Sequence, residues 1–295
     1  MAKPQFAYGG QAVIEGVVIR GRRTIALAVR RPSGAIYRYR EALDSPLERW
    51  KLARLPLVRG VVVLWESLVV GVRMLMRSAN VALEDDSVKL EGGSAAGFVL
   101  GTVAIALAIF VGVPYLATQA IHSLVPDAAW QNVIEGVLRL ALFLGYVVAI
   151  SFLPDVRRVF AYHGAEHMTI HAFEHGDPLR PEAIEPYPTA HPRCGTAFLL
   201  LVVVVSILVF AVLERANPIL ALVERLLLVI PVAAVSYEVL RFGARHEGSP
   251  LMKALVWPGL LLQRLTTRRP TRPMIEVAIA SLEEALAGDA EGKVA

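Results

Sequence analysis

The sequence predicts an α-helical membrane protein with about four transmembrane helices and a small N-terminal antiparallel β meander. Hydrophobic residues make up 55% of the 295-residue chain and charged residues only 19%, against roughly 25% charged residues in soluble proteins. The mean hydropathy is +0.53, and several uncharged runs approach the roughly 20 residues that cross a bilayer as a helix. The start of the chain is instead rich in β-branched and aromatic residues.

Residues 1–44 form the predicted meander. The stretches 12–20, 24–31 and 35–41 have the composition of strands, and the turn-like sequences RGRR and RPSG separate them. A small sheet has to bury its apolar face against a partner. We expect the cytoplasmic ends of the transmembrane helices to supply that partner.

Residues 45–96 are predicted to contain amphipathic or interfacial helices and a polar linker. Their most apolar part, 61–76, is interrupted by Glu66 and Arg73. This pattern favours an interfacial or core helix over a fifth span.

The membrane domain is predicted to cover residues 97–240. No Asp, Glu, Lys or Arg occurs in 92–126, and two of the apolar runs have no polar face, which argues against a large soluble helical core. In the last run the charges of Glu224, Arg225 and Glu238 fall near the ends, where they cost less than at the bilayer centre. The candidate spans are 97–121, 133–153, 197–213 and 219–240.

Residues 241–295 are predicted to form a cytoplasmic amphipathic C-terminal region, with helices near 252–265 and 271–288. Basic residues concentrate before the first span, in the loop 155–196 and after the last span. Positive charge favours the cytoplasmic side of a membrane. We therefore expect a multi-pass protein of the plasma (inner) membrane with both termini in the cytoplasm.

Charge and cysteine content narrow the expected partners. The formal net charge of +4 is too small to indicate a nucleic-acid partner, and a single cysteine excludes an intrachain disulfide. The expected partners are the lipid bilayer and a lipid-linked or membrane-peptide substrate. The sequence leaves the oligomeric state open.

Residues 161–177, AYHGAEHMTIHAFEHGD, contain four of the seven histidines at intervals of four. Pro154 and Asp155 favour a helix start and Gly176 a helix end, so 156–175 is predicted to be one helix. A spacing of four places the rings on successive turns of one face. The four histidines are His163, His167, His171 and His175.

His163 and His167 are candidate ligands for one metal ion. Glu166 completes the pattern H-x-x-E-H, in which the glutamate acts as the general base of a metal-dependent hydrolase. The four histidines span about 18 Å at 1.5 Å per residue, so they cannot all reach one ion. His171 is then either an exposed side chain or a group that orients a metal ligand. Glu174 is an exposed side chain, a group that orients a ligand, or itself a ligand.

A third ligand is expected from TAHPRCGT, residues 189–196, just before the third candidate span. His191 and Cys194 are both candidates, and the helix N-terminus at Cys194 favours the thiolate form that binds metals. Arg193 is a candidate for holding an anionic substrate group such as phosphate, or for pairing with a carboxylate or a lipid headgroup. Histidine and cysteine donors are typical of Zn²⁺, so a divalent ion, Zn²⁺ in the first place, is the expected cofactor.

Four stretches of the sequence carry a family resemblance: GGQAVIEGVVIRG (9–21), RVFAYHGAEHMTIHAFEHG (158–176), HPRCGTAFLL (191–200) and GLLLQRLTTRRPTRPMIEVAIASLEEAL (259–286). They resemble the YqhQ-like family, bacterial multi-pass membrane proteins of undetermined function that are often labelled predicted metal-dependent enzymes. The resemblance implies a shared fold and functional residues at the motif positions. Those positions are Gln11, Glu15, His163, Glu166, His167, Glu174, His191, Arg193, Cys194 and Thr196.

Three functions stay open from the sequence. The leading hypothesis is a membrane metal-dependent hydrolase whose site lies at the cytoplasmic surface. The alternatives are a non-catalytic metal- or haem-binding protein for transport, delivery or sensing, and an assembly scaffold for other membrane proteins. No candidate span carries a clear ionisable pathway at its centre, which argues against transport; Arg139 is expected one turn into the second span. An open coordination position would favour the enzyme, and a closed one would favour the scaffold.

Overall fold

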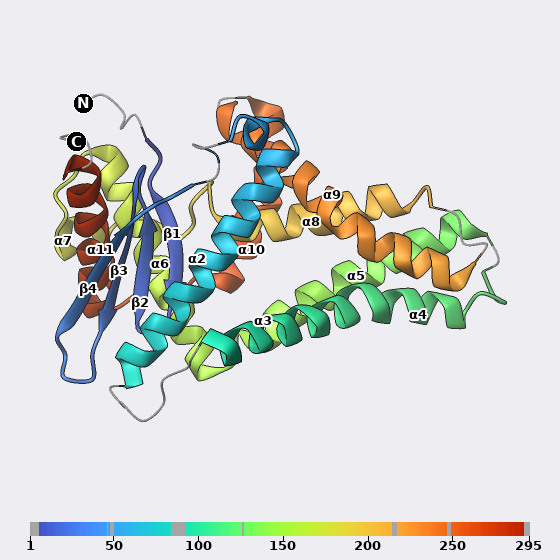
Figure 1. Cartoon of the computed structure of the whole chain (residues 1–295), viewed down its shortest axis with the longest axis horizontal. Coiled ribbons are helices and arrows are strands. Elements are labelled where there is room, and N and C mark those ends of the chain that lie inside the picture. The colour runs from blue at the N-terminus through green and yellow to red at the C-terminus, as the bar shows by residue number, and fades with distance from the viewer. Residues whose placement is uncertain are drawn as a thin grey trace.

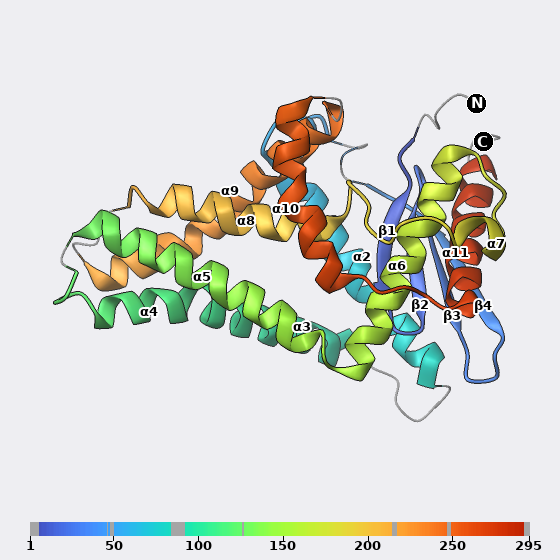
Figure 2. The same cartoon turned by 180° about the vertical axis from the view of Figure 1, so that it is seen from behind.

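The computed structural model describes residues 6–45, 47, 50–83, 92–125, 127–213, 217–246 and 249–291. Two parts are visible in Figures 1 and 2: a sheet unit at one end and a helix bundle that extends away from it. Two further helices, α2 (Val58–Leu83) and α10 (Pro250–Thr266), lie where the two parts meet, and a 3-10 turn, η1 (Leu52–Arg54), precedes α2.

The sheet unit contains four strands and three helices. Its strands are β1 (Gly9–Val13), β2 (Gly16–Arg20), β3 (Thr24–Arg30) and β4 (Ile36–Ala42), paired antiparallel in that order. Its helices are α6 (Pro154–His175), α7 (Pro181–Ile184) and α11 (Arg272–Glu291). The predicted meander is therefore present, with one more strand than the sequence indicated.

The prediction of a single strand over 12–20 is wrong. The chain reverses at Ile14 and Glu15, and Val13 pairs with Gly16 across the hairpin. Glu15 takes a positive φ of 52°, a conformation that short hairpin turns usually give to Gly or Asn. Because neither residue of the two-residue loop is Gly or Asn, the β-branched composition hid the turn.

The two faces of the sheet are covered by different helices. One face packs on α6 and α11 through a cluster that includes Val17, Ala28 and Leu282. The other face packs on α2, where Leu27 of the sheet and Met74 of the helix are both fully buried. The expectation that the ends of the transmembrane helices cover the sheet is therefore wrong, because α2 and the C-terminal helix already occupy both faces.

Asp289 joins the end of the chain to its beginning. Its carboxylate accepts hydrogen bonds from the backbone N–H groups of Arg22 and Arg23 at 2.6 and 2.8 Å and from the Tyr8 hydroxyl at 2.8 Å. Burial acts to raise the pKa of Asp289, but these donors hold it below its ordinary value. Burial and the Asp289 carboxylate raise the pKa of Tyr8 to about 12.

The helix bundle consists of α3 (Gly92–Leu107), a π-helical turn η2 (Ala108–Gly112), α4 (Val113–Ala120), α5 (Ala128–Ile150), α8 (Gly195–Phe210) and α9 (Pro218–Arg245). Among the described residues, three helical segments are long and apolar enough to cross a membrane, namely Val99–Ala120, Ala128–Ile150 and Pro218–Gly243. The protein is therefore a multi-pass membrane protein. The 16 residues of α8 are apolar but short, so the count of four spans stays a prediction.

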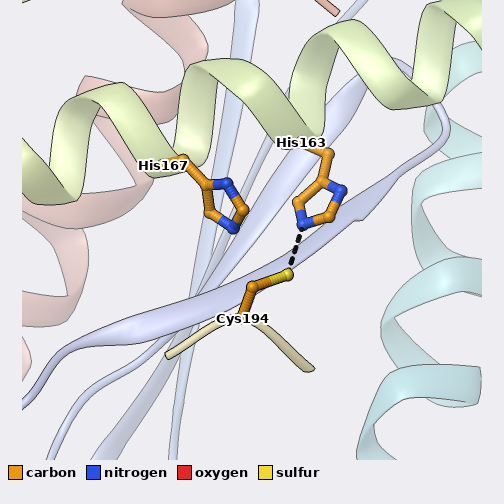
Figure 3. A group of neighbouring side chains, drawn as sticks. All are labelled: His163, His167 and Cys194. Carbon is orange, nitrogen blue, oxygen red and sulfur yellow. Dashed lines mark hydrogen bonds between the residues drawn. The ribbon is translucent and has the colours of Figure 1, made fainter. Parts of the chain in front are cut away.

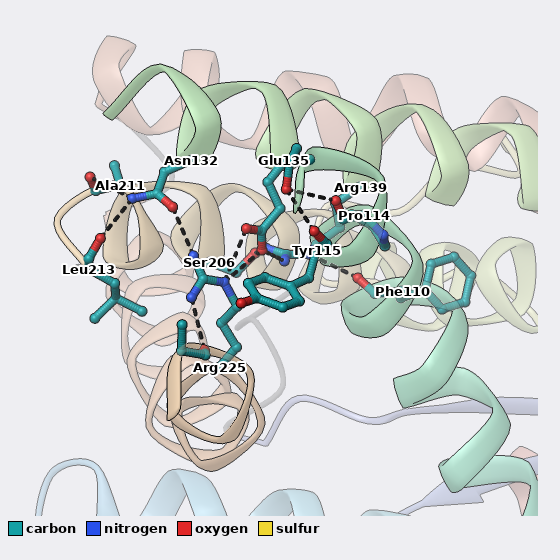
Figure 4. Close-up of polar contacts among 12 residues, drawn as sticks. Phe110, Pro114, Tyr115, Asn132, Glu135, Arg139, Ser206, Ala211, Leu213 and Arg225 are labelled. Atoms are coloured by element: carbon teal, nitrogen blue, oxygen red, sulfur yellow. Dashed lines mark hydrogen bonds and ion pairs between the residues drawn. The ribbon is translucent and has the colours of Figure 1, made fainter. Parts of the chain in front are cut away.

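Pro114 explains the π turn in the first of these segments. A proline has no N–H, so it cannot donate to the carbonyl four residues earlier, and it disturbs the helix there. In this helix that carbonyl belongs to Phe110, and Arg139 of α5 donates its Nε–H to it at 2.9 Å (Figure 4). A side chain from a neighbouring helix thus supplies the missing donor.

Arg139 belongs to a buried charged cluster inside the bundle (Figure 4). Glu135 accepts from Arg139 at 2.6 Å and from Arg225 of α9 at 2.9 Å. Arg225 also donates to Asn132 at 2.8 Å, and Arg139 donates to Ser206 of α8 at 3.1 Å. Arg139, expected one turn into its span, instead falls near the middle of α5, because this helix begins at Ala128.

Replacing Asp289 with Asn should lower the unfolding free energy at neutral pH by about 1–3 kcal/mol, because charge-assisted hydrogen bonds from partly buried donors are lost. A depressed pKa means that the carboxylate stabilises the fold above its unfolded pKa and that this stability disappears as pH falls through its folded pKa. The difference between the two proteins in thermal or denaturant unfolding should therefore shrink toward acidic pH. Glu291→Gln, at an exposed ion pair with Arg40, is the matched control and should change little.

Replacing Arg139 should lower the unfolding free energy by a smaller amount when Pro114 is also replaced. Pro114→Ala restores an N–H that can bond to the Phe110 carbonyl, so part of what Arg139 contributes is no longer needed. In a double-mutant cycle measured by unfolding in detergent, Arg139→Leu should cost about 1 kcal/mol less in the Pro114→Ala background than in the wild type. Equal costs in both backgrounds would contradict this account of the π turn.

Candidate metal centre

Helix α6 presents the histidine segment from within the sheet unit. The predicted helix 156–175 is confirmed: Pro154 stands in the first turn, and Gly176 ends the helix with a left-handed φ of 77°. Residues from Gly164 to Ile170 are buried on all sides. Polar side chains in this stretch must therefore find partners inside the protein.

His163, His167 and Cys194 form the candidate metal centre. One ligand atom from each of the three residues lies within 4.8 Å of the other two, and the two imidazole centroids are 4.3 Å apart. Figure 3 shows both rings extending from α6 toward the Cys194 sulfur, which comes from the start of α8. The His163 Nε2 and Cys194 Sγ atoms are 3.2 Å apart.

Backbone carbonyls define the tautomers of both histidines. His163 Nδ1 lies 2.9 Å from the carbonyl oxygen of Thr266, and His167 Nδ1 lies 2.6 Å from that of Thr189. A carbonyl can only accept, so each Nδ1 carries the proton and donates it, and each Nε2 keeps a free lone pair in the neutral ring. Histidines that bind metals are commonly oriented by such a bond from the second nitrogen.

Cys194 is the N-cap of α8. Its Sγ accepts from the backbone N–H of Thr196 at 3.4 Å and lies 3.2 Å from the Thr196 hydroxyl. The sulfur thus lies at the positive end of the α8 dipole. Thr196, a position that the family resemblance marked, acts by holding this sulfur.

Glu166 is buried next to His167 of the candidate metal centre. Its Oε1 accepts from the backbone N–H of Gly10 at 3.0 Å, and its Oε2 lies 3.5 Å from His167 Nε2. Burial raises the pKa of the Glu166 carboxyl, and His163 and His191 partly oppose that rise. Burial also lowers the pKa of His167, which favours the neutral ring that can bind a metal.

His191 lies beside the group rather than in it. Its ring centroid is 5.7 Å from that of His167 and 4.5 Å from that of His171. Its Nε2 is 3.5 Å from a carboxylate oxygen of Glu174, which also pairs with Arg193. Of the two expected third ligands, the structure brings Cys194 and not His191 into the three-residue group.

Other candidate residues lie outside the group. Glu15 pairs with Arg158 of α6 and accepts from the Tyr162 hydroxyl at 3.2 Å, and the Arg158 hydrogen bond lowers the pKa of Glu15. His171 donates from Nε2 to the Ala190 carbonyl at 2.9 Å, and burial lowers its pKa to about 4. The side chain of Gln11 faces α2, away from α6.

Sequence reasoning missed the residues that hold the loop 189–196 and the polar side chains of α6 in place. The buried side chain of Gln263, on α10, accepts from the N–H of His191 at 2.8 Å and donates to its carbonyl at 3.0 Å. Thr189 and Thr266 act through their carbonyl oxygens, and Gly10 acts through its N–H. Backbone groups of this kind leave no residue-type signal in a sequence.

The fold and this geometry define a class: a multi-pass membrane protein with a His/His/Cys group between a helix of its sheet unit and the start of a bundle helix. The family model for proteins of unknown function DUF1385 matches residues 55–288. The chain is also 31% identical over 297 residues to the uncharacterized protein YqhQ of Bacillus subtilis strain 168, covering 95% of this chain and 92% of that protein. The chain belongs to this YqhQ-like family, DUF1385. No solved structure matches it.

Proposed function

We propose that this protein is an integral membrane metal-dependent hydrolase of the cytoplasmic face of the plasma membrane. His163, His167 and Cys194 would hold the ion, and Glu166 would serve as general base. The observation that carries the proposal is the orientation of both Nε2 atoms toward one thiol sulfur, with a buried carboxylate beside them.

The donor types indicate which ion fits. Two neutral imidazoles and one thiolate suit Zn²⁺, whereas Mg²⁺ and Ca²⁺ prefer oxygen ligands. Three protein donors leave a fourth position for water or substrate, as in catalytic zinc sites. A bound divalent ion would supply Lewis acidity and lower the pKa of a water molecule in that position.

Glu166 has the surroundings of a general base. Its raised pKa brings proton uptake closer to neutral pH, which is where a base works best. Gly10 N–H holds one carboxylate oxygen, and the other oxygen is directed toward His167. Glu166 would accept a proton from the attacking water and return it to the leaving group.

A substrate in or on the membrane accounts best for the position of the group. Cys194 begins α8, an apolar helix of the bundle. The bond in question would belong to a lipid-linked molecule or to a peptide close to the membrane surface. Basic residues in the flanking segments favour the cytoplasm for this side of the membrane.

One observation favours a second candidate, a non-catalytic metal site. The His191 ring lies 5.7 Å from that of His167, close enough for a modest shift to bring a fourth protein ligand to the ion. A closed site of four protein ligands is typical of structural zinc and would suit delivery, sensing or a scaffold role.

Elemental analysis of the purified protein tests the metal directly. The wild-type protein should retain on the order of one divalent ion per chain, and the His163→Ala, His167→Ala double variant should retain almost none, because both imidazole ligands are gone. His175→Ala is the matched control, since His175 is exposed and bonds only within α6. Equal metal content in all three proteins would contradict the proposal.

Glu166→Gln separates catalysis from metal binding. The amide keeps the acceptor for Gly10 N–H but cannot take up a proton, so turnover should fall by roughly 10²–10⁴ while metal content stays at the wild-type level. The measurement is mass spectrometry of products released from a membrane lipid extract and from membrane peptides. A parallel loss of metal would identify Glu166 as a ligand instead, and unchanged turnover would exclude it as the base.

A further inference from the structure

A cavity of about 560 Å³ lies between the first strands of the sheet and α2. This volume is within the usual range for small-molecule sites. Two of its wall residues connect it to the candidate metal centre: Arg193 precedes Cys194 in the chain, and Gly10 donates its N–H to Glu166. Gly10 therefore belongs both to the cavity wall and to the immediate surroundings of the proposed base.

The charged side chains on the described wall of this cavity are both arginines, Arg20 and Arg193. Each is paired with a carboxylate that does not line the cavity: Arg20 with Glu66 at 3.2 Å, and Arg193 with Glu174. A guanidinium has five N–H donors, so a single carboxylate leaves others to face the cavity. Arginine forks of this kind match the oxygens of phosphate groups.

The rest of the wall is largely apolar. Val18 comes from the sheet, Val63 and Val70 from α2, and Tyr237 from α9. Helix α9 is one of the candidate membrane spans. The cavity thus extends from two cationic groups, one of which directly precedes Cys194 in the chain, to an apolar wall that reaches a membrane helix.

Helix α2 places the cavity at the membrane surface. It crosses α9 closely at Gly60, where a Cβ atom would lie 3.2 Å from the Ala234 carbonyl oxygen. Its outer face exposes large apolar side chains, including Trp65, which is 67% exposed, and Leu68. Tryptophan and leucine on a helix beside a span are typical of the headgroup region of a bilayer.

Gln11 provides a neutral polar group inside the cavity. Its amide lies against Gly71 of α2, where a Cβ atom would come within 2.9 Å of Nε2. The glycine leaves the room that this amide occupies. The cavity therefore offers cationic, amide and apolar walls together, which suits a ligand with a polar head and a hydrocarbon tail.

We infer that this cavity binds an anionic membrane lipid, with its phosphate-bearing head at Arg20 and Arg193 and the start of its chain along Val63, Val70 and Tyr237. The inference rests on the proposed function in one respect: it identifies that lipid class as the substrate presented to His163, His167 and Cys194. Binding itself requires only the cavity.

Native mass spectrometry of the full-length protein in detergent, titrated with phosphatidic acid, tests the inference. Phosphatidylcholine with the same acyl chains and inorganic phosphate form the comparison arms. Phosphatidic acid should bind at least about tenfold more tightly than either, since it alone presents an exposed phosphate group together with a chain. Equal binding of phosphatidylcholine, or binding of free phosphate without any contribution from the chain, would overturn it.

Variants locate the binding. Val70→Trp fills the cavity and should weaken phosphatidic acid binding by about tenfold or more, whereas Leu68→Trp, on the exposed face of the same helix, should leave it unchanged. Arg20→Gln and Arg193→Gln should each weaken it to a similar extent. Loss of Arg20 leaves the buried Glu66 without its ion pair. If the Arg20 variant unfolds for this reason, Val70→Trp still tests whether the lipid binds in this cavity. Wild-type affinity in Val70→Trp would overturn the assignment.

The same titration on the His163→Ala, His167→Ala variant separates the two proposals. If this metal-free variant still binds phosphatidic acid, the result supports lipid binding in the cavity independently of the hydrolase proposal. A wild-type protein that contains metal but shows no preference for phosphatidic acid would contradict the inference about the cavity and not the proposed metal site. A wild-type protein that contains no metal but binds phosphatidic acid in the cavity would contradict the metal-dependent hydrolase proposal and support the lipid site.

Discussion

The arrangement of the candidate metal centre depends on the burial of α6. This helix packs against the sheet and α11, so its polar side chains are removed from water and must be satisfied by the protein. His163 and His167 meet this requirement by donating to the carbonyls of Thr266 and Thr189. These two hydrogen bonds join α6 to the end of α10 and to the loop before α8, and they direct both Nε2 atoms toward Cys194.

Close backbone approach makes those hydrogen bonds possible. A Cβ atom on Gly164 would lie 2.1 Å from the carbonyl oxygen of Arg268, so only glycine allows the segment after α10 to run along α6. The N–H of Arg268 bonds to the carbonyl of Phe160 at 2.9 Å on the same stretch. Gly10 has a similar role on the sheet, since a Cβ there would lie 1.7 Å from the Val18 carbonyl oxygen.

Buried charge serves different purposes in the two parts of the molecule. Inside the bundle, Glu135 pairs with both Arg139 and Arg225, and side chains and backbone carbonyls accept from further donors of the two arginines. Such a cluster links α5, α8 and α9 and replaces the donor that Pro114 lacks. Beside the candidate metal centre, Glu166 accepts from one backbone N–H and pairs with no arginine among the described residues. Burial raises the pKa of the Glu166 carboxyl, which suits a role in proton transfer rather than a purely structural role.

Composition and local spacing by themselves determined the membrane class, the N-terminal strands, the helix 156–175 and the pair of imidazoles one turn apart, because these are short-range properties of a chain. Tertiary structure decided the rest. It divided the segment 12–20 at Ile14–Glu15, docked the C-terminal helix on the N-terminal sheet, and selected Cys194 instead of His191 to face His163 and His167. Those outcomes depend on contacts between residues far apart in sequence and on backbone carbonyls, which every residue possesses and no pattern of side chains reveals.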